Sequence, residues 1–344
     1  MKKGAFSMSI FRQLGQRQTQ TTTKRFELNG LHRLPAFIQQ FFHHLAAKHY
    51  SKQTAQRYVY DVLDFFRWVE HVSGTELEPE TIDLPSFTEI DHAGAEAYAT
   101  YLALDLENAP SVINRKLSTL QSLFNYLIET NQATVNPFQT VERPKRGKRN
   151  PVYLTESEWL DFSTLVRSNV GMTNREASWY EINRARDFLI IQLLGLTGMR
   201  VSELVGLNWS DINLETGTIR VIGKGNKERL IPIAGPLLPL LTAYHHTSSE
   251  GAVFQNEKGN RIAVRTVQHM LKGHIDRLKP YLPFLSYKQV TPHKLRHTFA
   301  SRLAMGGVDV LTIQQLLGHE SVATTQVYAH IGDERKKHAI SSLQ

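Results

Sequence analysis

Apolar residues recur every three or four positions along much of the chain, which is the spacing of the buried face of an α-helix. This pattern predicts helices over residues 51–69 and 113–127, the second after a Ser111 cap, and further helices around 34–49 and 93–106. The two clearest apolar faces consist of Tyr58, Val62, Phe65, Phe66 and Val69, and of Ile113, Leu117, Leu120, Phe124 and Leu127. Together these elements predict an all-α bundle that ends near Asn136-Pro137.

The second half of the chain mixes helical patterns with two short strand patterns. Helices are predicted over 155–167, 184–196 and 264–278, and strands over 218–222 and 229–233. Between the strands the chain reads Gly-Lys-Gly-Asn-Lys, and glycine and asparagine supply the positive backbone angles of a hairpin turn. Lys224 is therefore expected on an exposed tip. The fold class is predicted to be mainly α with a small antiparallel β-sheet.

A predicted helix near the C-terminus carries two groups that bind phosphate. Thr291 is a good N-cap and Pro292 a good first residue, so His293 and Arg296 lie one turn apart on one face. The buried stripe of this helix and its glycine stop are Leu295, Phe299, Leu303 and Gly306-Gly307.

Two shorter helices are predicted after it. The first, over 308–317, ends at Gly318 and leaves His319 just past a helix terminus. Ser321 is expected to cap the second, which carries Tyr328 near its end. Histidine, arginine and tyrosine side chains can thus converge.

Composition places the chain among globular proteins. With 344 residues and 41% hydrophobic content it can bury sizeable cores, and its length suggests two domains. The formal charge of +8 favours a polyanionic partner such as DNA, although an ordinary solvated surface gives the same charge. The absence of cysteine excludes disulfides, thiolate nucleophiles and cysteine-ligated zinc. No stretch approaches the roughly 18 apolar residues of a membrane span, and a cytoplasmic protein is expected.

Four segments are predicted along the chain: a loose, basic arm over 1–30, a helical domain over 31–141, a linker over 142–150 and a larger domain over 151–344. The linker carries five basic residues between 142 and 149 together with proline and glycine, which suits an exposed connection. Contact with a phosphate backbone is the favoured interpretation, and a solvated linker with no partner is the alternative. Its candidate contacts are Lys145, Arg146, Lys148 and Arg149.

Several motifs resemble those of the tyrosine recombinases, in the order that this family shows them. They are Thr-Gly-Met-Arg-Val-Ser-Glu-Leu at 197–204, Gly-Lys-Gly-Asn-Lys-Glu-Arg at 223–229, His-Lys-Leu-Arg-His-Thr at 293–298, Leu-Leu-Gly-His at 316–319 and the final Tyr328. Residues 113–127, followed by Asn136-Pro137, are similar to the core-binding domain of the bacterial Xer branch. The motif over 290–298 and the ending over 328–337 resemble the single-recombinase form called XerS.

The resemblance implies a complete catalytic site. Arg200 and Arg296 match the phosphate-clamping arginines, Lys224 the hairpin lysine that serves as general acid, and Tyr328 the nucleophile that forms a 3′-phosphotyrosyl bond. His293 matches the histidine that accepts or shares the tyrosine proton, and His319 the one that binds the phosphate. Glu203 occupies an acidic position one turn from Arg200 and is expected to orient it, although a surface ion pair would look the same in sequence.

The resemblance also implies the partners and the biological role. The two domains would form a C-shaped clamp on double-stranded DNA, four copies would act on two sites, and strands would be exchanged through a Holliday junction. The C-terminal segment over 333–343 would dock on a neighbouring subunit, or pack back on its own domain. Chromosome dimer resolution is the expected task, with a second recombinase and a DNA translocase as candidate partners and no metal or cofactor.

Other interpretations stay open at this point. Each site residue taken singly has an ordinary structural explanation, Lys227 competes with Lys224, and His297 and His330 are expected to be structural or adjacent to DNA. The histidine pairs at 43–44 and 245–246 have no acidic partner pattern that would suggest a metal. The alternatives to a Xer-type recombinase are an integrase of a phage or conjugative element, a type IB topoisomerase and a non-catalytic DNA-binding protein. Candidate DNA contacts outside the linker, which are equally compatible with solvated positions, are Asn114, Arg115, Ser118, Gln121, Arg265 and Lys272.

Overall fold

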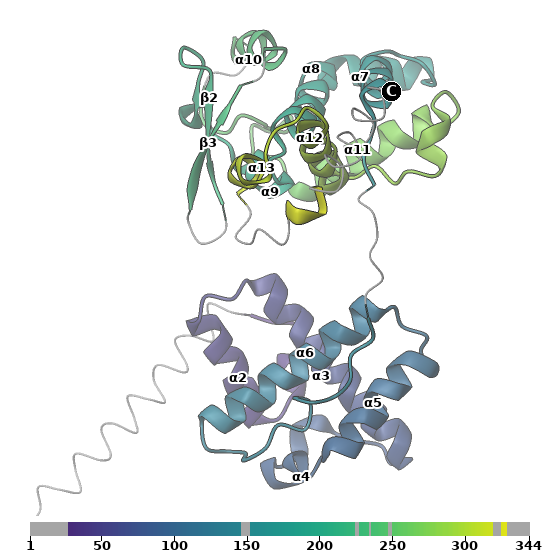
Figure 1. The fold of residues 1–344 in the computed structure, drawn as a ribbon, viewed down its shortest axis with the longest axis vertical. Helices are drawn as coiled ribbons and strands as arrows, with labels where there is room; N and C mark the ends of the chain where they lie inside the picture. Colours follow the sequence, from purple (N-terminus) through teal and green to yellow (C-terminus); the bar gives the residue numbers. More distant parts are fainter. Residues whose placement is uncertain are drawn as a thin grey trace, which may run out of the picture. The chain divides into compact units, whose positions relative to one another are not determined.

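The described residues fold into two compact units, one within residues 1–148 and the other within residues 149–344 (Figure 1). The computed structural model describes residues 27–145, 152–223, 227–233, 235–246, 250–318 and 325–328. Each unit encloses its own hydrophobic core. Over these ranges no helix is long and apolar enough to span a bilayer.

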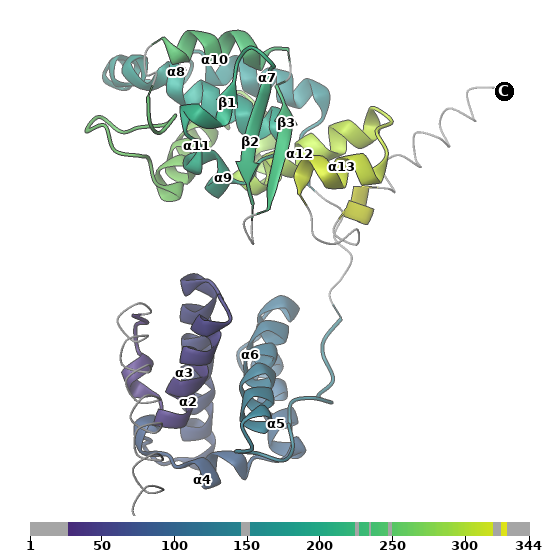
Figure 2. The same ribbon diagram turned by 90° about the vertical axis from the view of Figure 1, so that its left-hand side faces the viewer.

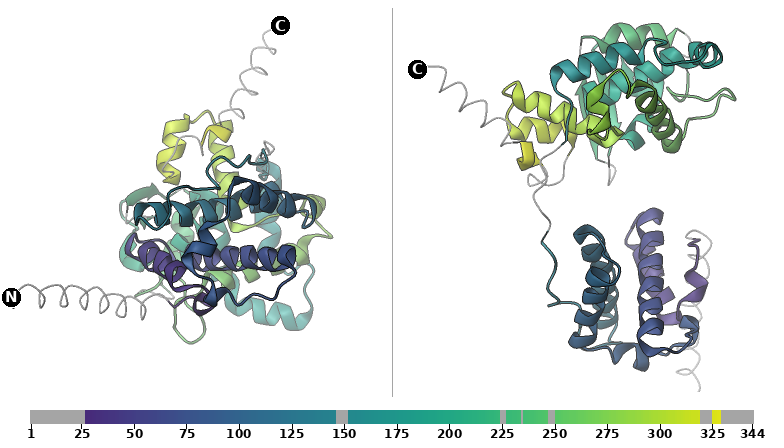
Figure 3. Two further views of the ribbon diagram at one scale, coloured as in Figure 1. Left: turned by 90° about the horizontal axis from the view of Figure 1, so that it is seen from below. Right: turned by 90° about the vertical axis from the view of Figure 1, so that its right-hand side faces the viewer.

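Helices make up the N-terminal unit. Its elements are the 3₁₀ helix η1 (Leu31–Arg33), α2 (Ala36–Ala47), α3 (Lys52–Ser73), η2 (Pro79–Thr81), α4 (Leu84–Thr88), α5 (His92–Leu104) and α6 (Pro110–Glu129). The long helices α3 and α6 pack against each other, and α2 packs against both (Figure 3). Large aromatic side chains fill the space between them, and Phe65 alone has five ring neighbours: Phe66, Trp68, Phe87, Tyr98 and Phe138.

Local capping determines where these helices begin. The Ser51 hydroxyl accepts a hydrogen bond from the Thr54 amide at 3.1 Å and starts α3. The predicted Ser111 cap of α6 was wrong, because this helix begins at Pro110 and its N-cap position is Ala109. Proline suits the first helical position since its missing N–H would have no partner there.

The C-terminal unit combines helices with one small sheet. Its elements are α7 (Glu156–Val166), α8 (Asn174–Thr197), α9 (Val201–Gly206), η3 (Trp209–Asp211), β1 (Ile212–Asn213), β2 (Thr218–Ile222), β3 (Glu228–Pro232), α10 (Leu237–His245), α11 (Val264–Leu278), η5 (Pro283–Ser286), α12 (Pro292–Met305), α13 (Val310–Leu317) and η6 (Gln326–Tyr328). Helix α8 is ten residues longer at its start than the sequence pattern predicted, because Thr173 and Glu176 form a capping box there.

The three strands pair antiparallel in the order β1-β2-β3. Ile219 lies opposite Ile231, and both are buried, whereas Leu230 and Ile222 on the other face are exposed. This alternation is expected for a sheet with one covered face. The outer strand β3 runs beside α13 (Figure 2), so the sheet is joined to the C-terminal helices.

Candidate active site

The segment around Arg200 is shaped by a glycine and an acidic residue. Helix α8 ends at Thr197, the following Gly198 has a positive φ of 63°, and the chain turns there into α9 with Arg200 as its N-cap. One Glu203 carboxylate oxygen accepts from the Arg200 backbone N–H at 2.7 Å, and the other accepts from its guanidinium at 2.9 Å. Glu203 therefore fixes both the backbone and the side chain of Arg200.

A second arginine, Arg229 on β3, holds the same carboxylate. Its two terminal nitrogens donate to the two oxygens of Glu203 at 3.0 and 2.8 Å. Burial favours a higher pKa for Glu203, but hydrogen bonds and charge from Arg229 and Arg200 hold that pKa below its ordinary value. Glu203 is thus a buried carboxylate that links β3 to α9. Arg229 was not identified as a site residue from the sequence. The sequence feature that could have indicated it is its place as the last residue of the hairpin motif over 223–229.

Three arginines donate hydrogen bonds to the backbone carbonyl oxygens at the C-terminal end of α13. Helix ends expose unpaired carbonyls and carry partial negative charge, so cations stabilise them. Arg229 donates to Leu316 O at 2.9 Å, Arg296 to Leu317 O at 2.6 Å and Arg200 to Gly318 O at 3.4 Å. The backbone immediately before His319 is therefore held by the arginine cluster, although His319 itself lies outside the described residues.

Helix α12 presents Arg296 toward this cluster. The Thr291 hydroxyl caps the helix by accepting from the Lys294 amide at 3.2 Å, as the sequence predicted. The Arg296 side chain is buried, and it donates to Gly198 O at 2.7 Å. Burial and the neighbouring Arg200 charge lower the pKa of Arg296 to about 10, so its guanidinium stays charged at neutral pH.

Tyr328 lies against α12, and its hydroxyl contacts Nδ1 of His297. Nε2 of His297 lies 3.1 Å from Nε2 of His293, so the two histidines and the tyrosine form a continuous chain. The Tyr328 side chain is only 1% exposed and packs among Ala300, Ala304, Ile313 and Leu317. Burial raises its pKa to about 12, although the Arg296 charge acts in the opposite direction.

The position of His297 differs from the sequence interpretation, which expected a structural or DNA-adjacent residue. His293 was expected to accept or share the tyrosine proton, and its ring is linked to the Tyr328 hydroxyl through His297. The available signal was spacing, because residues four apart on a helix share one face.

Some predicted site residues fall outside the described residues. These are Lys224, Arg146, Lys148 and Arg149, together with His319 and His330. The base of the hairpin is described, and its closing hydrogen bond runs from the Gly223 amide to Lys227 O at 2.8 Å. The hairpin that carries Lys224 therefore starts from the same two strands that place Arg229.

The predicted DNA contacts on α6 have partners within the chain. Arg115 pairs with the buried Asp61, and Asn114 donates to Pro144 O at 3.0 Å. Ser118 and Gln121 both accept from Arg143, at 2.7 and 2.6 Å. The start of the linker is thus fastened along the polar face of α6. By contrast, the side chains of Lys145, Arg265 and Lys272 are exposed.

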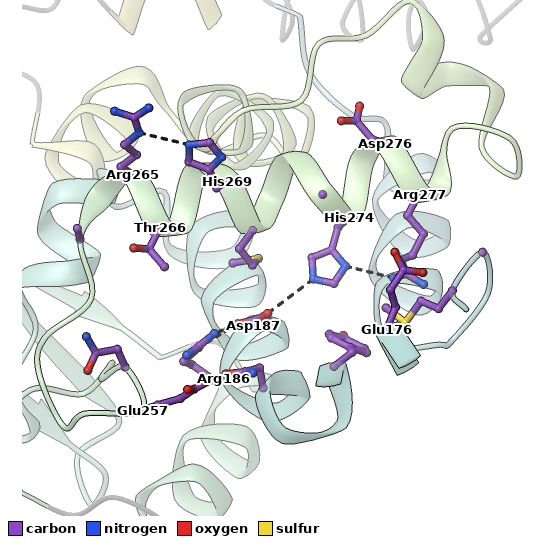
Figure 4. A pocket seen from close by; sticks show the side chains of 18 of the residues that line it. Glu176, Arg186, Asp187, Glu257, Arg265, Thr266, His269, His274, Asp276 and Arg277 are labelled. Atoms are coloured by element: carbon purple, nitrogen blue, oxygen red, sulfur yellow. Dashed lines mark hydrogen bonds and ion pairs between the residues drawn. The ribbon is translucent and has the colours of Figure 1, made fainter. Parts of the chain in front are cut away.

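A separate hollow of about 1120 Å³ lies between α8, α11 and the loop over 256–258 (Figure 4). Arg265 on its wall donates to His269 at 3.3 Å. The buried His274 lies 4.0 Å from Asp187 and 3.1 Å from Arg277. Burial, with the Arg277 charge beside it, lowers the pKa of His274 to about 4, so this imidazole is neutral at neutral pH.

Comparison with known proteins adds two family matches and several relatives. Residues 172–335 match the Phage integrase family, and residues 37–134 match the Phage integrase, N-terminal SAM-like domain. Tyrosine recombinase XerC of Caldanaerobacter subterraneus subsp. tengcongensis is 32% identical over 339 residues, which cover 93% of this chain and 90% of the relative. Tyrosine recombinase XerD of Pasteurella multocida is 30% identical, with 88% and 96% covered.

Solved structures with a similar fold include two DNA complexes. XerH site-specific recombinase bound to palindromic difH substrate superposes with a TM-score of 0.64 at 22% identity, covering 84% of this chain and 79% of that one. A lambda integrase (75–356) dimer bound to a COC′ core site gives a TM-score of 0.61 at 20% identity, covering 85% and 94%. At these identities the likeness concerns the fold.

Proposed function

The chain belongs to the tyrosine recombinases of the Xer branch, and from this premise we propose that Tyr328 cleaves and rejoins DNA at a specific site. The observation that carries the proposal is the shared location of Tyr328, the histidine pair on α12 and the arginine cluster. Tyr328 contacts His297 on α12, the helix that also carries Arg296, and Arg296 and Arg200 both donate to carbonyls at the end of α13. This proximity supports the proposal that Tyr328 and the arginines serve one site.

The proposed reaction is a transesterification. The Tyr328 oxygen attacks the phosphorus, a 3′-phosphotyrosyl bond forms, and the bond to the 5′-oxygen breaks. Guanidinium groups donate paired hydrogen bonds to phosphate oxygens and offset the negative charge of the pentavalent transition state. Arg200, with 39% of its side chain exposed, is open to a phosphate, while the buried Arg296 supplies fixed positive charge behind it. We assign Lys224 as the general acid and His319 as a phosphate ligand.

The proposed partner is a double-stranded recombination site. The net charge of +8 supports it, because cationic surfaces gain affinity by releasing counterions from DNA. In this proposal residues 31–141 are the core-binding domain, 142–150 a basic linker and 151–344 the catalytic domain. Four copies would act in the cytoplasm on two sites, with the segment over 333–343 docking between copies, and the task would be resolution of chromosome dimers. A second recombinase and a DNA translocase are the further partners that this role allows.

A plasmid assay tests the proposed function. A supercoiled plasmid that carries two copies of a candidate chromosomal site is incubated with the protein, with Tyr328→Phe and with Tyr287→Phe. Tyr287 is 73% exposed and serves as a matched control. We expect deletion or inversion between the sites with the wild-type chain and with Tyr287→Phe, and none with Tyr328→Phe. Relaxation of plasmids that lack the sites would instead indicate a topoisomerase.

A further inference from the structure

The hydroxyl proton of Tyr328 must leave before or during attack on phosphorus, and in the described part of the chain the side chain of His297 contacts that hydroxyl. We propose that His297 is a catalytic residue that accepts this proton, and that His293 passes it on to solvent. The inference rests on the proposed function of Tyr328 and adds a proton path to it. It assigns His297 a role in the reaction, where the sequence had suggested a structural or DNA-adjacent residue.

Geometry supports a two-histidine relay. His293 and His297 lie four residues apart on α12, so their rings share one face of the helix, with centroids 4.5 Å apart. Their Nε2 atoms are 3.1 Å apart, and a hydrogen bond at that distance requires a proton on one of them. When His297 carries that proton on Nε2, its Nδ1 is an acceptor, and this is the atom that meets the Tyr328 hydroxyl.

The surroundings of the three side chains favour proton transfer from Tyr328 toward His293. Tyr328 is sealed from water, whereas His293 is exposed at the other end of the chain of contacts. The Arg296 guanidinium favours the tyrosinate, and burial together with the Arg296 charge lowers the pKa of His293 below its ordinary value. A proton that reaches His293 is therefore released to solvent rather than retained.

The step balances. The Tyr328 O–H proton moves to Nδ1 of His297, while the proton on Nε2 of His297 moves to Nε2 of His293. The tyrosine oxygen forms its bond to phosphorus as the bond to the 5′-oxygen breaks, and that oxygen takes a proton from the general acid. In rejoining, His297 returns a proton to the tyrosine oxygen when its bond to phosphorus breaks.

The variant His297→Asn tests the role of the base. An asparagine amide places a polar atom near the position of Nδ1 but does not accept a proton at neutral pH. We expect covalent adduct formation on a nicked duplex to slow by about 100-fold, which is within the usual range for loss of a general base. His246→Asn, an exposed position after α10, is the matched control and should leave the rate unchanged.

A bypass substrate separates proton transfer from structural damage. A DNA strand that ends in a 3′-(p-nitrophenyl phosphate) is joined to a 5′-hydroxyl strand in the Tyr328→Phe background, so no tyrosine proton is involved and nitrophenolate leaves unprotonated. We expect Tyr328→Phe and Tyr328→Phe/His297→Asn to join these strands at the same rate. If the His297→Asn change slowed cleavage and the bypass reaction equally, the role of His297 would be merely structural and the proposal would be overturned. An unchanged cleavage rate in His297→Asn would also overturn it.

A readout without DNA keeps this inference distinct from the proposed function. In the full chain labelled with ¹³C at the tyrosine Cζ atoms, the Tyr328 resonance is identified by its loss in Tyr328→Phe. We expect this resonance to shift in His297→Asn and to stay in place in His246→Asn. An unshifted resonance would overturn the proposed contact, whereas a wild-type chain that cleaves no site would overturn the proposed function instead.

Discussion

Glu203 is a carboxylate with only 4% of its side chain exposed, held between Arg200, three residues before it, and Arg229 on β3. Removing one partner from a buried ion pair costs more than the pair contributes, because the remaining charge stays buried without compensation. The Arg229 side chain is 11% exposed, so its pairing with Glu203 is of this buried kind. At the residue scale, the site therefore depends on Arg229 as well as on the arginines that the sequence motifs indicate.

A double-mutant cycle measures this dependence. Arg229→Met and Glu203→Met should each lower the free energy of unfolding by about 3 kcal/mol. The double variant should lose clearly less than the sum, with a coupling energy of about 2 kcal/mol, because no charge is left unpaired between the two positions. Urea denaturation of the full chain measures these values.

A matched control for the cycle lies on the neighbouring strand. Arg220 on β2 donates to Asp211 at 2.7 Å, but its side chain is 44% exposed. Arg220→Met should therefore cost less than about 1 kcal/mol, as exposed ion pairs do. Additive effects of Arg229→Met and Glu203→Met would contradict the account of Glu203 as a shared buried charge.

At the scale of elements, the turn from α8 into α9 places Arg200 and also supplies the carbonyl of Gly198 to Arg296. Gly198 combines a positive φ of 63° with close packing, since a β-carbon there would lie 2.3 Å from the Phe299 ring. Gly217, before β2, has the same backbone conformation, with φ of 62°, but open space around it. A comparison of substitutions at the two glycines therefore distinguishes the cost of a left-handed backbone from the cost of steric crowding.

Alanine at each glycine should have different consequences. Gly217→Ala should cost about 1 to 2 kcal/mol of stability from the left-handed backbone alone, and it should leave cleavage unchanged. Gly198→Ala should cost a further 1 to 3 kcal/mol from overpacking, and it should slow adduct formation because the carbonyl bound by Arg296 is displaced. Thermal unfolding and single-turnover cleavage check both. Equal effects of the two substitutions would contradict the role assigned to this turn.

Elements with local signals were the ones that the sequence predicted well. The predicted cap Thr291 bonds to the amide of Lys294, three positions away, so the signal lies within one short window. The first ten residues of α8 were missed, because they are mostly polar and present no apolar stripe. The two-residue strand β1 was missed because two residues are too few to show alternation.

Site residues were likewise hard to predict where their contacts join positions far apart in the sequence. Arg200 and Arg296 were identified from motifs, but their joint contact with the end of α13 joins residues about 20 to 120 positions apart. Arg229 and His297 were not assigned to the site, because what distinguishes them is a tertiary contact with Glu203 or Tyr328. The four-residue spacing of His293 and His297 places both on one face of α12, but it does not indicate which distant residue that face contacts.

For the molecule as a whole, the described part of the site belongs to the C-terminal unit, which has its own core. The N-terminal unit contributes helices whose predicted DNA contacts are engaged within the chain, most firmly Arg115 with the buried Asp61. Its role in DNA binding remains part of the proposed function. The covalent chemistry proposed for the C-terminal unit is therefore best tested at Tyr328.

That test is the covalent adduct. The full chain is incubated with nicked duplexes that carry candidate chromosomal sites, the denaturant-resistant protein–DNA species is isolated, and the modified peptide is identified by mass spectrometry after nuclease and protease digestion. The account predicts a 3′-linked nucleotide on Tyr328, an adduct that Tyr287→Phe still forms and Tyr328→Phe does not. An adduct that persists in Tyr328→Phe, or that maps to another residue, would contradict it.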